Sequence, residues 1–178
     1  MRLKSYVGAI ITKEGKQRLA AEILELEGKL KKSRNDNGDR NARRSGDTGN
    51  GMPARDEVSR QHDNIRYRLE DRTLFYEQAT VAEEPFRRDT LEIGCVGRLR
   101  RRSNGLWLYT HVHVVGLGET ECDSTPRKLS YDAPLIAPFH TQRQGYEEEV
   151  TIGKVTRTYR LIAIYLPSDK EVRDLRDS

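Results

Sequence analysis

The first part of the chain repeats hydrophobic residues at helical spacing. Between Lys13 and Ser33 these positions follow one another at intervals of four, three and four residues, as Leu19, Ile23, Leu26 and Leu30. This is the seam spacing of a coiled coil. Thr12, which precedes the stretch, is a good N-cap residue. The pattern therefore predicts a helix over Lys13–Ser33 that packs against a partner helix.

A second helical stretch follows over Ala54–Thr80. Pro53 suits a first helical turn. Hydrophobic side chains fall near one stripe of this stretch, at Val58, Ile65, Leu69, Tyr76 and Ala79. At about 1.5 Å per residue the two helices would be roughly 30 and 40 Å long, lengths that suit an antiparallel pair. The chain between them, about residues 33–53, would then be the tip of a hairpin.

Beyond residue 82 the pattern changes from helical to alternating. Strands are expected at four stretches, namely Leu91–Arg101, Leu106–Gly116, Glu148–Lys154 and Thr156–Leu166. The sequence "SNG" at 103–105 is typical of a hairpin turn, and a short helix is expected near Pro134–Phe139. The chain is thus predicted to be α+β, with a helical hairpin over 1–82 and a small antiparallel sheet domain with one short helix over 83–178.

Charge is concentrated in the predicted tip. The stretch "SRNDNGDRNARRSGDTGNG" at 33–51 has Ala42 as its one apolar side chain. Seven basic and three acidic residues lie between Lys31 and Arg55, which accounts for the whole net charge of +4. A basic segment with no capacity to form a core is typical of a contact with nucleic acid or an acidic surface. A solvated linker is the alternative.

Several functional classes find no support in the sequence. It has no apolar run of the roughly 20 residues that a membrane span needs and no secretory signal, so we expect a cytoplasmic protein with no membrane contact. Cys95 and Cys122 form no CxxC pair, which fits a reducing compartment. His111 and His113 share a strand face and could bind a metal, but no third ligand is evident. No hydrolase or nucleotide-binding motif occurs, so we do not expect an enzyme.

The order of the motifs resembles that of a known family. The stretches in question are "ITKEGKQRLAAEILELEGKL", "YEQATV", "VVGLGETECD" followed by "KLSYDAPLIAP", and "VTRTYRLIAI". Together they are similar to the Gre family of bacterial transcript cleavage factors. The resemblance implies an N-terminal antiparallel coiled-coil hairpin and a C-terminal domain of FKBP-like fold.

The resemblance also implies a partner and a mechanism. Family members insert the hairpin into the secondary channel of RNA polymerase, where acidic tip residues help to hold a Mg²⁺ ion that activates water to cleave backtracked RNA. The family tip reads Gly-Asp, two residues, then Glu-Asn. In "GDTGNG" Asp47 falls on the family's aspartate, whereas Asn50 or Gly51 takes the place of its glutamate. Asp36 and Asp39 are secondary candidates for the missing carboxylate.

Further site residues follow from the same resemblance. Arg40, Arg43 and Arg44 would lie along nascent RNA and neutralise its phosphates. The polymerase-binding residues of the family fall on the turn formed by Asp132, Ala133 and Pro134. We expect no cofactor bound to the protein alone, a Mg²⁺ ion shared with RNA polymerase through Asp47, and a monomer.

Three other functions stay open at this point. A Gre-like paralogue could plug the polymerase channel and inhibit synthesis without stimulating cleavage. A basic protein could bind nucleic acid through the tip alone. A prolyl isomerase is suggested by fold analogy only, and the sequence shows no aromatic-lined pocket for it.

Overall fold

The computed structural model describes the backbone of residues 5–43, 52–83, 85 and 88–176, with the side chains of 34–43, 52–56, 58 and 176 left out. The chain divides into two compact units. The helical unit comprises Met1–Gly8 and Lys16–Ala79, and the sheet unit comprises Ala9–Gly15 and Thr80–Ser178. The sequence did not indicate that Ala9–Gly15 belongs with the sheet.

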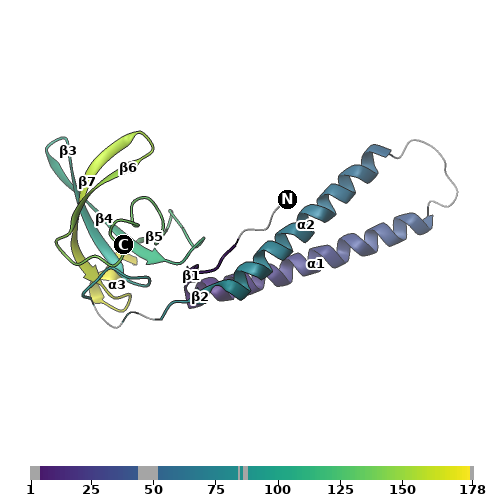
Figure 1. Ribbon diagram of the computed structural model, residues 1–178, viewed down its shortest axis with the longest axis horizontal. Helices are drawn as coiled ribbons and strands as arrows, with labels where there is room; N and C mark the ends of the chain where they lie inside the picture. The colour runs from purple at the N-terminus through teal and green to yellow at the C-terminus, as the bar shows by residue number, and fades with distance from the viewer. Residues whose placement is uncertain (1–4, 44–51, 84, 86–87, 177–178) are drawn as a thin grey trace. The chain divides into compact units, whose positions relative to one another are not determined.

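Two long helices make up most of the helical unit, α1 over Lys13–Arg43 and α2 over Met52–Gln78 (Figure 1). The predicted start of the first helix is confirmed. Helix α1 nevertheless runs past its expected end at Ser33, and α2 begins ahead of Ala54, so the helices include part of the stretch assigned to the tip. Residues 34–43 contain no proline, and extending an existing helix requires no new nucleus.

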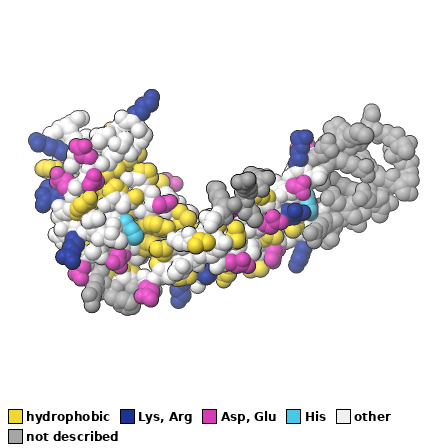
Figure 2. Space-filling view, in the orientation of Figure 1, with side chains coloured by type: hydrophobic (Ala, Val, Ile, Leu, Met, Phe, Trp, Pro, Cys, Tyr) yellow, Lys and Arg dark blue, Asp and Glu magenta, His cyan; other side chains and the backbone are white. Residues whose placement is uncertain are grey.

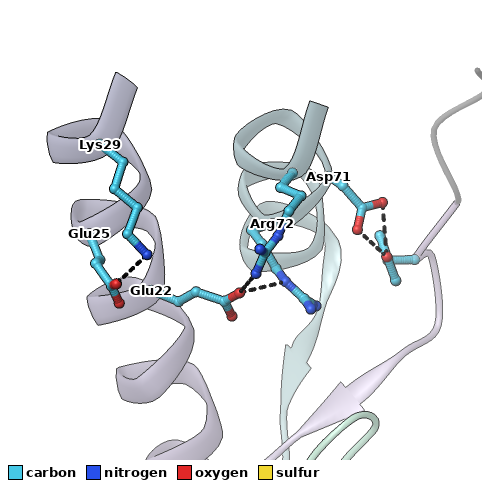
Figure 3. Close-up of polar contacts among 7 residues, drawn as sticks. Glu22, Glu25, Lys29, Asp71 and Arg72 are labelled. Carbon is cyan, nitrogen blue, oxygen red and sulfur yellow. Dashed lines mark hydrogen bonds and ion pairs between the residues drawn. The ribbon is translucent and has the colours of Figure 1, made fainter. Parts of the chain in front are cut away.

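Polar contacts show that the two helices run antiparallel. The Nε of Arg72 and the Nη2 of Arg68 lie 3.2 and 3.4 Å from the Oε1 of Glu22. Nearer the start of α1, the Nζ of Lys16 lies 4.8 Å from the ring centroid of Tyr76. Residues further along α1 thus contact residues that come earlier in α2, as in an antiparallel pair. Figure 3 shows Glu22 reaching from α1 toward Arg72 on α2, beside the Glu25–Lys29 ion pair within α1.

The predicted hydrophobic seam is only partly the buried one. Leu19 and Leu26 of the first helix are buried, as the spacing suggested. On α2 the buried aromatic residue is Phe75, whereas its neighbour Tyr76 is exposed. The hydrophobic spacing had placed Tyr76 in the buried stripe, because Phe75 and Tyr76 are adjacent and both lie close to that stripe.

Tyr6 packs against α2 and hydrogen-bonds to it, which holds the N-terminal segment on this helix. Its ring stacks on that of Phe75 with the centroids 4.5 Å apart. Its hydroxyl donates to the carboxylate of Asp71 at 2.9–3.0 Å, and its backbone N–H donates to the Oε1 of Gln78 at 2.8 Å. Burial, followed by the hydrogen bond to Asp71, raises the pKa of the Tyr6 hydroxyl. The segment therefore shields Phe75 from water.

The sheet unit contains a five-stranded sheet in the order β5-β4-β3-β7-β6. Its strands are β3 (Val96–Ser103), β4 (Leu106–Val115), β5 (Arg127–Ser130), β6 (Glu147–Ile152) and β7 (Val155–Tyr165). The pairs β3–β4, β3–β7 and β6–β7 are antiparallel, whereas β4–β5 is parallel. The prediction of a purely antiparallel sheet was therefore wrong. The missed strand, β5, is only four residues long and has no alternating pattern of its own.

The predicted hairpin turn at 103–105 is present, whereas the short helix predicted near Pro134–Phe139 is not. Asn104 and Gly105 have φ of 49° and 80°, the left-handed conformation of a two-residue hairpin turn, which confirms the prediction for "SNG". The short helix expected near Pro134–Phe139 is instead a series of turns. Pro138 lacks the N–H group that a helix starting at Pro134 would use there. A short helix, α3, is found at Lys170–Arg176.

One face of the sheet carries the hydrophobic core. Its fully buried members come from the strands, from the segment before β3 and from the turns beyond β5, namely Leu91, Leu99, Val112, Val114, Ile136, Phe139 and Leu161. Leu99 pairs with Leu161 across β3 and β7, which puts both on the face that packs against the turns. The core thus fixes the position of the residues that follow β5.

A small parallel pair completes the sheet unit. Strand β1 (Ile10–Ile11) pairs with β2 (Thr80–Val81) in the register Ile10↔Thr80. The N–H of Leu117 donates to the Ile10 carbonyl at 2.8 Å, which joins this pair to the loop after β4. A Cβ on Gly116 would lie 2.4 Å from the Ile11 Cα and 2.8 Å from the Ile10 oxygen. Only glycine therefore allows this close backbone contact.

We predict that Gly116→Ala lowers the free energy of unfolding by at least about 2 kcal/mol, because the new methyl group meets backbone that cannot move aside. Gly28→Ala, in the middle of α1, is the matched control, since a Cβ there would meet no atom within 4 Å. It should raise helix stability by about 0.5–1 kcal/mol. Urea unfolding followed by circular dichroism checks both variants, and equal stabilities would contradict the close contact.

Candidate functional site

A hydrogen-bonded turn follows β5 and contains the residues that the sequence selected for partner binding. The N–H of Ala133 donates to the Ser130 carbonyl at 2.9 Å and closes the turn. The buried Ser130 hydroxyl donates to the Oδ1 of Asp132. Asp132 and Pro134 are exposed, and Ala133 is half-buried. The turn therefore offers a carboxylate and a rigid apolar ring to solvent side by side.

The base of this turn is anchored in the core. The N–H of Tyr131 donates to the Val115 carbonyl at 3.0 Å, and the N–H of Ser130 donates to the Thr120 hydroxyl at 3.1 Å. The rings of Tyr131 and His140 lie 5.5 Å apart. Burial lowers the pKa of His140, a shift that Glu92 partly opposes. The turn thus presents Asp132 and Pro134 on a fixed base, the condition for a preorganised contact.

A buried carboxylate joins the start of α1 to the loop after β4. Glu119 is 8% exposed. Its Oε1 accepts the backbone N–H of Thr12 at 2.6 Å, and its Oε2 accepts the Thr12 hydroxyl at 2.5 Å. The same hydroxyl accepts the N–H of Gly15 at 2.9 Å, which confirms Thr12 as the N-cap of the helix. Thr12 and Glu119 both belong to the sheet unit.

Sequence reasoning missed the role of Glu119. The available signal was the acid that follows "GLG" after a strand, together with the Thr12 and Gly15 spacing. A Cβ on Gly15 would lie 2.1 Å from the Glu119 Oε1, so glycine leaves the space that the carboxylate fills. Neither stretch alone identifies the contact between Thr12 and Glu119, because the two residues are 107 positions apart in the chain.

The predicted tip residues lie outside the part of the structure that can be described. Asp47, Asn50 and Arg44 fall between the two helices. Asp36, Asp39, Arg40 and Arg43 belong to the backbone of α1, but their side chains are not described. Their proposed roles therefore rest on the sequence alone.

Within the described part of the chain, the fold brings no third ligand to the alternative metal candidate. His111 and His113 are both half-buried on β4. Burial, followed by the charge of Arg98, lowers the pKa of His111. Among the described residues, no three His, Cys, Asp or Glu side chains lie together in an arrangement that could hold a metal ion.

Of the helices described, none is long and apolar enough to cross a membrane.

Solved structures similar to this chain include two of Gfh1. One is described as the transcription factor Gfh1, with 20% identity over 92% of this chain and 99% of that chain, at a TM-score of 0.39. Another is GreA factor homolog 1 of Thermus thermophilus, with 21% identity over 88% of this chain and 98% of that one, at a TM-score of 0.38. The prokaryotic transcription elongation factor GreA/GreB from Nitrosomonas europaea has 16% identity over 88% and 98%, at 0.36. These neighbours are Gre-type factors. No family model and no curated protein matches the chain.

We predict that Thr12→Val lowers the free energy of unfolding by about 2–3 kcal/mol, because it removes both the helix cap and the hydroxyl that donates to a buried carboxylate. Thr12→Ser keeps the hydroxyl and should stay within about 1 kcal/mol of the parent. Chemical unfolding of the three proteins measures the difference. A Thr12→Val variant as stable as the parent, or a larger loss in Thr12→Ser than in Thr12→Val, would contradict this role of the hydroxyl.

Proposed function

We propose that the protein is a transcription elongation factor that binds bacterial RNA polymerase with its sheet unit and inserts its helix pair into the secondary channel of the enzyme. In this proposal the helices form a coiled-coil hairpin and the sheet unit is FKBP-like. The factor regulates the polymerase active site and has no complete active site of its own. It modulates the cleavage of RNA in backtracked complexes.

Two features of the chain support this role. The described parts of α1 and α2 run antiparallel, held by the Glu22–Arg72 and Lys16–Tyr76 contacts. A pair of long helices that buries little more than one seam suits insertion into a narrow channel better than it suits a compact core. The second feature is the order of the Gre-like motifs, with "GDTGNG" in the segment between the two helices.

The turn after β5 is the proposed anchor on polymerase. Asp132 is exposed and Ser130 holds its carboxylate in place, so little side-chain entropy is lost when it meets a basic partner surface. Pro134 adds a rigid apolar contact next to it, and Ala133 leaves room for close approach. A preformed contact of this kind favours binding because its ordering cost is already met within the fold.

The tip is the proposed effector. A carboxylate is a preferred ligand of Mg²⁺, and Asp47 would share such an ion with the polymerase. The amide of Asn50 offers an oxygen without charge, so the ion would be held less firmly than by two carboxylates; Asp36 and Asp39 are the further candidates. Arg40, Arg43 and Arg44 would neutralise phosphates of the nascent RNA.

The missing second carboxylate favours one alternative function. A factor with Asn50 at this position could occupy the channel and inhibit nucleotide addition without stimulating cleavage. Occlusion depends on the bulk of the hairpin and not on the charge of its tip. The two functions therefore share an anchor and differ in what the tip does.

For the anchor, we predict that Asp132→Arg weakens binding to RNA polymerase by at least about tenfold, because a charge that met a basic surface is reversed. Asp174→Arg, at an exposed position on α3, is the matched control and should bind like the parent. Binding is measured by fluorescence anisotropy with a labelled factor. A folded Asp132→Arg variant that binds as tightly as the parent would contradict the anchor.

For the tip, we predict that Asp47→Ala abolishes any stimulated cleavage of backtracked RNA without weakening polymerase binding, and that Asn50→Glu increases cleavage by restoring a second carboxylate. Cleavage and nucleotide addition are measured on a stalled elongation complex with the parent and both variants. If all three proteins inhibit nucleotide addition equally and none stimulates cleavage, the protein is the inhibitory plug. If none affects either reaction, the polymerase assignment is wrong.

A further inference from the structure

The sheet has a second face, opposite the core, on which arginines and aromatic rings alternate. The register pairs Arg98 with His111, Arg100 with Tyr109 and Arg102 with Trp107, so these six residues lie on one face of β3 and β4. Leu99 and Val112, by contrast, lie on the core face and are buried. Figure 2 shows Lys and Arg side chains at several points along the margin of the sheet unit. We call Arg98, Arg100, Arg102, Trp107 and Tyr109 the arginine–aromatic face.

Within this face each ring is in contact with a guanidinium group. The Cζ of Arg98 lies 4.4 Å from the ring centroid of Tyr109, and the Cζ of Arg100 lies 4.1 Å from that of Trp107. Arg102 approaches Trp107 from further away, at 5.9 Å. Despite these contacts, Trp107 is 50% exposed and Tyr109 is 47% exposed. Planar cations and planar rings therefore follow one another along the hairpin and remain open to a partner.

The charge of the face is not balanced locally. Glu147 and Glu149 reach the same face only on β6, which β7 separates from β3, and there Glu147 lies opposite Arg160. The guanidinium groups of the face thus carry positive charge that an anionic partner would balance.

We propose that the arginine–aromatic face binds single-stranded nucleic acid, with phosphates on the arginines and bases stacked on Trp107 and Tyr109. Sheet faces that combine exposed aromatic rings with basic side chains bind single strands in this way, since every base has a π-face and every linkage carries a phosphate. The inference is independent of polymerase binding and of the tip residues.

The composition of the face favours a single strand over other anionic partners. In a duplex the bases are stacked on one another and cannot reach Trp107. An acidic peptide would satisfy the arginines but would supply no planar group for the rings. A single strand uses both kinds of side chain at once.

The experiment uses Trp107 as its probe, because it is the chain's single tryptophan. Titration of the full-length protein with a 12-nucleotide oligouridylate or oligothymidylate should quench its fluorescence in a saturable way. Affinity should fall as salt rises, because binding releases counterions. The two oligonucleotides distinguish RNA from DNA as the ligand. A blunt duplex of the same length and a polyglutamate peptide serve as controls and should quench far less.

Variants then test the individual side chains with a labelled oligonucleotide. Tyr109→Ala should weaken binding by about 5- to 100-fold, the usual effect of losing one stacked base. Arg102→Ala should reduce the salt dependence. Arg157→Ala is the matched control, since Arg157 lies opposite Val150 and so on the core face, and it should bind like the parent. Arg100→Lys keeps the charge but loses the planar group, and it should weaken binding while leaving the salt dependence unchanged.

Three outcomes would overturn the proposal. The first is oligonucleotide binding without a change in Trp107 fluorescence, which would assign binding to another surface such as the basic tip. The second is equal quenching by polyglutamate, which would indicate an acidic protein partner. The third is unaltered affinity in both Tyr109→Ala and Arg102→Ala when circular dichroism shows that both are folded.

Discussion

The buried carboxylate of Glu119 is the interaction on which the described structure most depends. It lies where three pieces of chain meet: the end of β1, the first residues of α1 and the loop after β4. Charged groups are seldom buried unless they are well satisfied. Here Thr12 supplies two donors, and the same threonine caps the helix. A single residue therefore both starts α1 and holds the buried charge, so that helix initiation and sheet assembly are linked.

Local signals in the sequence were enough to locate most of the elements. The Thr12 cap and the Asn104–Gly105 turn were both identified, because each depends on a few adjacent residues. The parallel strand β5 and the contact between Glu119 and Thr12 were not. They depend on residues that are more than ten positions apart, and no periodicity marks them. The turns at Pro134–Phe139 were taken for a helix of about one turn, limited by Pro138, and the structure forms only turns there.

The turn of the candidate site and the arginine–aromatic face were predictable to different extents. The turn at Asp132 was located correctly from its motif, but its bond to Ser130 requires the fold, since it depends on β5 placing the serine beside Val115. For the arginine–aromatic face the signal was present in the sequence. With "SNG" as a two-residue turn, the alternation in "RLRRR" and "WLY" already places the arginines of one strand opposite the rings of the other. To recognise the face, however, the register of the two strands must be known as well as their positions.

The pairing of β1 with β2 makes residues 16–79 an insertion within the sheet unit. The chain leaves the unit after Gly15 and returns to it at Thr80, and β1 and β2 are adjacent and parallel. The ends of the inserted segment are thus fixed by the sheet, whatever lies between them. Such an arrangement allows the helices to be lengthened, shortened or exchanged in evolution by equal changes on both arms, while the register of the sheet stays the same. The length of the helices can therefore change without any change in the sheet.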